Sequence, residues 1–168
     1  VIARGALPGS PWIDFFWPIF GVGVVAGALL ATRLKIGGDL RLLLAVAYVL
    51  QSAGIAAGLW RPTLAGFAFG SLLLGLPFTA ITFFALQEVR RLRPATAAST
   101  IGLLTTLYGI GQIVGPPLAA RLVARSASAA AGFALALEIA AAALLFGAAV
   151  FASMTRLFPK DRAAGSLP

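Results

Sequence analysis

Residues 129–154 read AAAGFALALEIAAAALLFGAAVFASM, and this stretch decides the class of fold. It contains one charged side chain, Glu138. At ~1.5 Å of rise per residue, a helix of this length exceeds the ~30 Å hydrocarbon core of a bilayer. A buried helix of a soluble protein keeps a polar face, which this stretch lacks. We therefore predict a transmembrane helix here.

Four further apolar stretches precede it, at residues 12–32, 42–60, 63–86 and 97–120. Trp12, Trp17 and Trp60 lie at the ends of two of them, where indole rings favour the headgroup region. Only 11% of the residues are charged, against roughly 25% in soluble proteins. The sequence predicts an all-α, polytopic membrane protein with five transmembrane helices. Because the connections are short, we expect residues 1–168 to form a single transmembrane unit.

The net charge of +8 would suggest nucleic-acid binding in a soluble protein, but here the basic residues separate apolar stretches. That pattern is typical of loop charges that orient a protein in the membrane, so we expect no nucleic-acid partner. Nine of the 13 basic residues fall on one side: Arg33, Lys35, Arg41, Arg90, Arg91, Arg93, Arg156, Lys160 and Arg162. Arg4, Arg61, Arg121 and Arg125 fall on the other. The count predicts an N-terminus outside and a C-terminus in the cytoplasm, and an N-terminus outside without a signal peptide suggests a preceding helix.

The residue inventory excludes most catalytic chemistry. The chain has no cysteine and no histidine, so thiolate nucleophiles, imidazole bases and the usual zinc sites are ruled out. No carboxylate pair or phosphate-binding loop is visible. We expect neither an enzyme nor a metal or cofactor site.

Small residues and prolines recur inside the spans. Glycines four residues apart allow close helix contacts in lipid: Gly23 and Gly27, Gly54 and Gly58, Gly66 and Gly70, Gly111 and Gly115. Pro77, and the pair Pro116 and Pro117 after Gly115, predict helix kinks, because proline removes a backbone donor. Kinked helices occur at transporter binding sites, but many only bend.

Polar residues follow the helical period on the third and fourth spans. Thr79 and Thr82 share one face, and Thr105, Tyr108 and Gln112 share another. A lipid-facing stripe would be apolar, so both faces are predicted to look inward. They either hydrogen-bond between helices or form the polar wall of a substrate cavity.

Two acidic residues have two interpretations each. Glu138 lies ~14 Å into the last span, and is either a proton-coupling acid or a structural acid bonded to a neighbouring helix. Glu88 lies at a helix C-terminus, where the macrodipole disfavours an anion. With Arg90, Arg91 or a basic residue of another loop it forms either a cytoplasmic gate pair or a solvated loop charge.

Three stretches carry a resemblance: LPGSPWID (residues 7–14), LQEVRRLRP (86–94) and YGIGQIVGPPLAAR (108–121). The chain resembles the C-terminal half of a major facilitator superfamily (MFS) transporter of the YbfB/YjiJ type. The resemblance implies that the spans are helices 8–12 of a twelve-helix bundle, with helices 8, 10 and 11 lining the cavity. It also implies a peripheral helix for Glu138, which weakens a coupling role.

The resemblance implies a cytoplasmic gate in the loop after the first span. Arg33 matches the basic position of the Gly-x-x-x-Asp-basic motif, but Ala28 and Thr32 replace its glycine and aspartate. Asp39 and Arg41 are candidates to serve instead.

These inferences predict transport of a small solute by alternating access, as one half of a secondary transporter in the bacterial inner membrane. Its expected partners are membrane lipid, the missing N-terminal half and an unidentified small molecule, and the fragment is not expected to transport alone. The alternatives are a small membrane interaction or regulatory protein without transport activity, and a compact transporter completed by homodimerisation.

Overall fold

The computed structural model describes residue 7 and residues 9–34 and 39–159, which are almost entirely helical. The long helices are α2 (Phe16–Arg33), α3 (Leu40–Trp60), α4 (Leu64–Leu92), α5 (Ala97–Arg125) and α6 (Ala129–Leu157). Two short 3-10 helices, η1 (Pro11–Phe15) and η2 (Pro94–Thr96), precede α2 and α5. All five long helices are apolar enough to cross a membrane, and the described residues contain no strand. The predicted all-α, five-span fold is confirmed.

Three of the long helices begin at side-chain caps, and three continue well beyond the predicted spans. Asp39, Thr63 and Ser128 each accept a hydrogen bond from a backbone N–H of the first turn that follows. The predicted spans stopped near the first basic residues, whereas α4, α5 and α6 continue to Leu92, Arg125 and Leu157. Long basic side chains reach water from an apolar helix end, so a charge need not end the helix.

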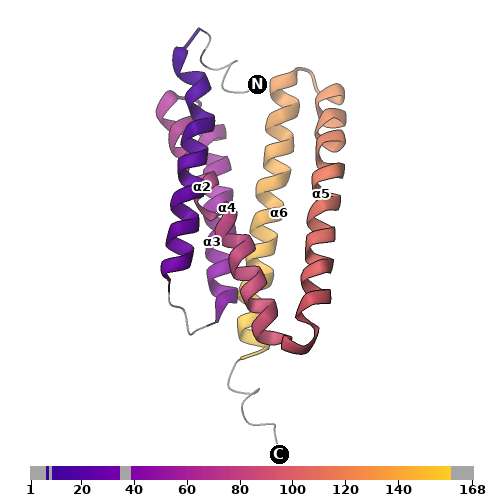
Figure 1. Cartoon of the computed structure of the whole chain (residues 1–168). Helices are drawn as coiled ribbons and strands as arrows, with labels where there is room; N and C mark the ends of the chain where they lie inside the picture. The colour runs from indigo at the N-terminus through magenta and orange to yellow at the C-terminus, as the bar shows by residue number, and fades with distance from the viewer. Residues whose placement is uncertain (1–6, 8, 35–38, 160–168) are drawn as a thin grey trace, which may run out of the picture.

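The bundle has two parts (Figure 1). Helix α4 packs against both α2 and α3, and these three helices form the better-buried part. Helix α6 packs along α3, and α5 packs along α6 at the edge of the bundle. None of the α5 residues is buried. The first part is therefore held by several helix contacts, and α5 by few.

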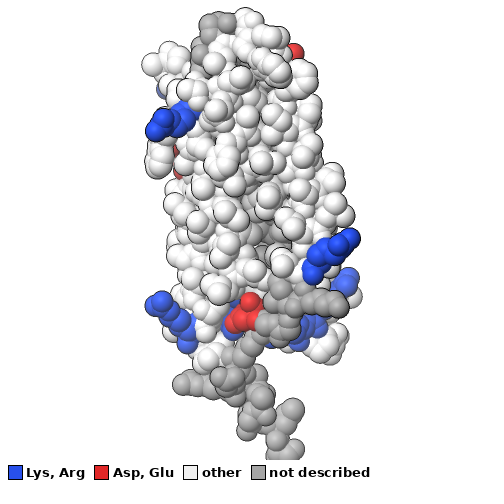
Figure 2. All heavy atoms as spheres, turned by 90° about the vertical axis from the view of Figure 1, so that its left-hand side faces the viewer, with Lys and Arg blue, Asp and Glu red and all other residues white. Residues whose placement is uncertain are grey.

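Charges gather at the two ends of the bundle, which we call the Arg41 end and the Trp60 end. Figure 2 shows white side chains over most of the middle of the face in view. The alternating helix directions place Arg33, Arg90, Arg91, Arg93 and Arg156 at the Arg41 end, and Arg61, Arg121 and Arg125 toward the Trp60 end. Arg4, Lys35, Lys160 and Arg162, which entered the charge count, lie outside the described residues.

Glycines set the contact between α4 and its two neighbours. A Cβ at Gly23 of α2 would lie 2.7 Å from the carbonyl oxygen of Leu72, and one at Gly27 would overlap the carbonyl of Leu76. A Cβ at Gly54 of α3 would lie 2.8 Å from the amide nitrogen of Leu74. Backbone therefore meets backbone at these crossings, which leaves no room for a side chain.

Not every predicted glycine pair packs this way. No atom lies within 4 Å of a Cβ built at Gly111 or Gly115, so this pair makes no close helix contact in the described structure. The helix assignment also runs unbroken through Pro77 in α4 and through Pro116 and Pro117 in α5. Pro77 is buried, while the two prolines of α5 are exposed.

Gly27→Ala tests the role of the close contacts. The added methyl group would overlap the Leu76 backbone, so we expect the free energy of unfolding to fall by about 1–3 kcal/mol. The measurement is the midpoint of detergent-induced unfolding, followed by circular dichroism. Gly21→Ala is the matched control in the same helix, since no atom lies within 4 Å of its Cβ position. Equal stability of the two variants would contradict the close-contact account.

Candidate functional site

A cavity of about 770 Å³ lies between the α3–α4 side of the bundle and the α5–α6 side. We call it the central cavity. Its lining residues come from all four helices: Tyr48, Gln51, Ile55, Leu74, Tyr108, Gly111, Gln112, Gly115, Pro116, Ala140, Ala143 and Leu144. Its volume falls within the range of ~300–1,000 Å³ that is usual for small-molecule sites.

The polar side chains of the central cavity lie near the middle of their helices. Tyr48 and Gln51 flank the midpoint of α3, three residues apart, and so share a face. Tyr108 and Gln112 flank the midpoint of α5, four residues apart. None of the four makes a hydrogen bond to another described residue. Two phenol hydroxyls and two carboxamides are therefore available to a bound molecule at mid-depth.

The ring of Tyr48 packs against α6. It packs edge-on against Phe151, with ring centroids 5.5 Å apart. A Cβ at Gly147 would lie 2.7 Å from one carbon of the Tyr48 ring and 2.8 Å from another. The absence of a side chain at Gly147 thus lets the ring lie against the α6 backbone beside the cavity.

The predicted substrate residues separate into different places. Tyr108 and Gln112 line the central cavity, whereas Thr79 and Thr82 line a groove of about 390 Å³ between α2 and α4. The Thr79 hydroxyl donates to the carbonyl of Val24 at 3.1 Å and so links α4 to α2. The Thr105 hydroxyl donates to Ile101 within its own helix. Of the two predicted stripes, only that of α5 reaches the central cavity, through Tyr108 and Gln112.

Glu138 is exposed on α6, outside the residues that line the cavity. It makes no hydrogen bond or ion pair with the described residues. The Ser52 hydroxyl donates to the carbonyl of Ala141 at 3.2 Å, which fixes the register of α3 against α6. By that register and ~1.5 Å per residue, Glu138 lies only about 4.5 Å along the bundle axis from the level of Ser52, so it differs from the cavity residues in its exposed face and not in its depth.

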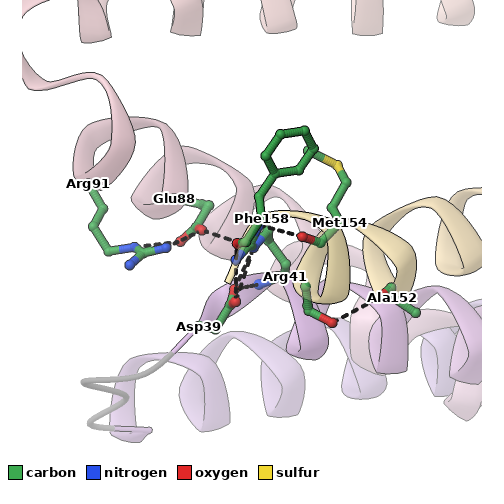
Figure 3. A network of polar contacts seen from close by, with 8 residues as sticks. Asp39, Arg41, Glu88, Arg91, Ala152, Met154 and Phe158 are labelled. Atoms are coloured by element: carbon green, nitrogen blue, oxygen red, sulfur yellow. Dashed lines mark hydrogen bonds and ion pairs between the residues drawn. The ribbon is translucent and has the colours of Figure 1, made fainter. Parts of the chain in front are cut away.

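A second polar cluster lies at the Arg41 end and joins three helices (Figure 3). Arg41 is buried, and its Nε donates to both carboxylate oxygens of Asp39, at 2.8 and 3.1 Å. Its two terminal nitrogens donate to the carbonyls of Met154 and Phe158, each at 2.8 Å. One guanidinium therefore ties the start of α3 to the end of α6.

Glu88 completes this cluster from α4. Its side chain is 8% exposed and accepts two hydrogen bonds from Arg91, at 2.8 and 2.5 Å. It also lies 4.0 Å from the Nε of Arg41. Near the C-terminus of α4 the helix dipole disfavours the carboxylate, and the two guanidinium groups offset that cost. Two cations and two anions thus neutralise one another in a largely buried place.

The predicted gate residues are only partly brought together. Asp39, Arg41 and Glu88 belong to the cluster, whereas Arg33 and Arg90 are exposed and form no ion pair with the described residues. Arg91, an alternative partner of Glu88 in the sequence, is the one that binds it. The sequence did not point to Tyr48 and Gln51, because both residues stand among apolar residues and belong to no repeated polar stripe.

The described residues offer no group of three or more His, Cys, Asp or Glu that could hold a metal ion. The arrangement can bind an organic molecule by hydrogen bonds and apolar contacts. Five helices that are long and apolar enough to cross a membrane place the chain in the class of polytopic membrane proteins.

The particular family follows from the sequence match. Residues 1–152 match the family model described as uncharacterised MFS-type transporter YbfB, and the chain belongs to this family. It is 31% identical over 105 residues to "Membrane protein MosC" of Rhizobium meliloti. The aligned part covers 61% of this chain and 25% of that protein's length. No solved structure gives a significant match.

Arg41→Met tests the cluster. The change removes the guanidinium that pairs with the carboxylates of Asp39 and Glu88, and it leaves the carbonyls of Met154 and Phe158 without their donor. We therefore expect the free energy of unfolding to fall by about 3–5 kcal/mol. Unfolding in a graded detergent mixture, followed by circular dichroism, measures it. Arg90→Met removes an exposed arginine without an ion pair and should change stability by less than about 0.5 kcal/mol. Similar losses in both variants would refute the proposed anchoring role.

Proposed function

We propose that the chain moves a small solute across the bacterial inner membrane by alternating access, as the C-terminal half of an MFS-type secondary transporter. The observation that carries the proposal is the central cavity, where Tyr48, Gln51, Tyr108 and Gln112 are free to bind at mid-depth. Secondary transporters hold their solute near the bilayer midplane, between parts that rock against each other. Membership of an MFS-type transporter family supports the same function.

The missing partner in this proposal is the other half of the transporter. The chain spans well under half the length of the curated relative that it matches. An edge helix without a buried residue, α5, is consistent with further protein packing beside it. The proposal therefore assigns transport to the longer assembly and solute contacts to this chain.

The test begins with the gene product in its own cell. A chromosomal C-terminal tag and a blot of the membranes should reveal a band well above 17.2 kDa. Cells that overproduce this product should redistribute at least one small solute between cell and medium, and a proton ionophore should abolish the redistribution. The double variant Tyr108→Phe and Gln112→Ala should lose it at an equal protein level, because it lacks two cavity polar groups.

Two outcomes would count against the proposal. A band at 17.2 kDa would favour the alternative, a small membrane interaction or regulatory protein that stands alone. Unchanged solute distribution, with the longer product present in the membrane at its normal level, would contradict transport itself.

Orientation gives a separate prediction. Basic residues are more numerous at the Arg41 end, so we place that end and the C-terminus in the cytoplasm, and the N-terminus outside. The chain has no cysteine, so single exposed cysteines can report sidedness. A membrane-impermeant thiol reagent on intact cells should label Ala127→Cys, in the α5–α6 turn, and spare Ala95→Cys, in η2. The reverse pattern would show the opposite orientation.

A further inference from the structure

One side of α6 carries a carboxylate and is not covered by the described helices. Its residues follow one another at alternate steps of three and four, and all of them are exposed: Leu135, Glu138, Ala142, Leu145 and Ala149. We call these five residues the Glu138 face. Steps of three and four residues form a row along one side of a helix, which is the spacing by which two helices pack along each other in a left-handed pair.

The Glu138 face points away from the central cavity. Helix α6 contacts α3 at Gly147 and α5 at Gly132, and it lines the cavity with Ala140. At 3.6 residues per turn, Glu138 and Ala142 each lie about 160° around the helix axis from Ala140. A segment that fills the cavity would therefore lie across α6 from the Glu138 face and would not cover it.

Glu138 restricts what can cover this face. The residue lies ~14 Å from the start of α6, at a depth where a carboxylate is deprived of water. It makes no hydrogen bond or ion pair with the described residues, and the other four members of the face are alanines and leucines. A polar side chain in the hydrocarbon region is stabilised by a polar group of a neighbouring helix. The occupant of the face must therefore bring a hydrogen-bonding group to the depth of Glu138.

A second copy of the chain meets this requirement by symmetry. All copies cross the membrane in the same direction and at the same depth, so a twofold contact along α6 places Glu138 opposite Glu138. A protonated carboxyl group both donates and accepts, so two of them, or one with a carboxylate, can hydrogen-bond to each other. The small side chains of Ala142 and Ala149 allow the two helices to approach closely.

We propose that a second copy of this protein docks on the Glu138 face, α6 against α6, and that the two Glu138 carboxyl groups hydrogen-bond to each other across the twofold axis. The contact leaves the central cavity on the far side of α6, so this dimer does not complete a solute pathway. The inference does not depend on the proposed transport function.

Disulfide cross-linking of the tagged gene product in its own membranes tests the contact. Because a twofold axis brings each residue of the face close to its own copy, Ala142→Cys and Ala149→Cys should each form a disulfide-linked dimer when copper phenanthroline and oxygen oxidise the thiols. Ala143→Cys is the matched control, an exposed alanine next to Ala142 that lines the central cavity instead. It should give no more dimer than the product without an added cysteine.

Changes at Glu138 test the hydrogen bond itself in the Ala142→Cys background. Glu138→Leu removes the polar group, so the yield of cross-linked dimer should fall about threefold or more, as expected for the loss of one interhelical hydrogen bond in lipid. Glu138→Gln keeps a group that both donates and accepts, so its yield should stay within about twofold of the parent's. Both variants are compared at equal amounts of protein in the membrane.

The outcomes decide the proposal whatever the length of the gene product. A linked band at twice the mass of the unlinked product supports a second copy, and a linked band of any other mass would show a different partner. Absence of a dimer at both Ala142→Cys and Ala149→Cys, or equal yields at Ala142→Cys and Ala143→Cys, would overturn the contact. A yield that is unchanged in Glu138→Leu, or lost in Glu138→Gln as in Glu138→Leu, would overturn the carboxyl pair. None of these results bears on solute redistribution, which tests the transport function separately.

Discussion

The structure depends on backbone-to-backbone contact between α4 and its two neighbours. In lipid, apolar side chains gain little by leaving the acyl chains, so helices associate through close van der Waals packing. At Gly23 and Gly27 of α2, and at Gly54 of α3, the α4 backbone occupies the space that a Cβ would need. The hydroxyl of Thr79 adds a hydrogen bond to the α2 backbone at the same contact. These contacts fix three helices as one body and leave α5 and α6 to be placed against it.

The second pair of helices is attached differently, and this difference creates the central cavity. Helix α6 meets α3 through Ser52, the Tyr48 ring on Gly147, and the Arg41 bonds to its last turn. Helix α5 relies on α6, chiefly where Gly132 lies against the backbone of Val123 near their shared turn. Since Gly111 and Gly115 contact nothing closely, α5 stands off from α3 at mid-depth. The space between them has polar walls because both helices carry tyrosine and glutamine there.

The sequence predicted the number and approximate bounds of the spans because apolar length is a local property that needs no knowledge of packing. It also put Tyr108 and Gln112 on one face of a helix, because their spacing is visible along the chain, and both line the central cavity. It could not identify Tyr48 and Gln51 as their counterparts, since that relation depends on how α3 faces α5. For the same reason, the glycine spacing of Gly111 and Gly115 looked identical to that of Gly23 and Gly27, yet only the second pair meets a neighbouring backbone. The choice of Arg91 over Arg90 for Glu88 likewise depends on helix rotation: a residue three positions on lies on the same face, and one two positions on does not.

Helix α3 contributes to the glycine contacts, to the central cavity and to the charged cluster, and its sequence shows how the three are compatible. Gly54 lies in its half toward the Trp60 end and faces α4, Tyr48 and Gln51 lie in the middle beside the cavity, and Arg41 lies in the first turn. A buried cation costs free energy unless it is fully paired, and Arg41 has Asp39, Glu88 and two carbonyls to satisfy it. Those partners hold the charge at the end of the helix, where water is near. The middle of α3 is thereby left with the uncharged polar side chains of Tyr48 and Gln51.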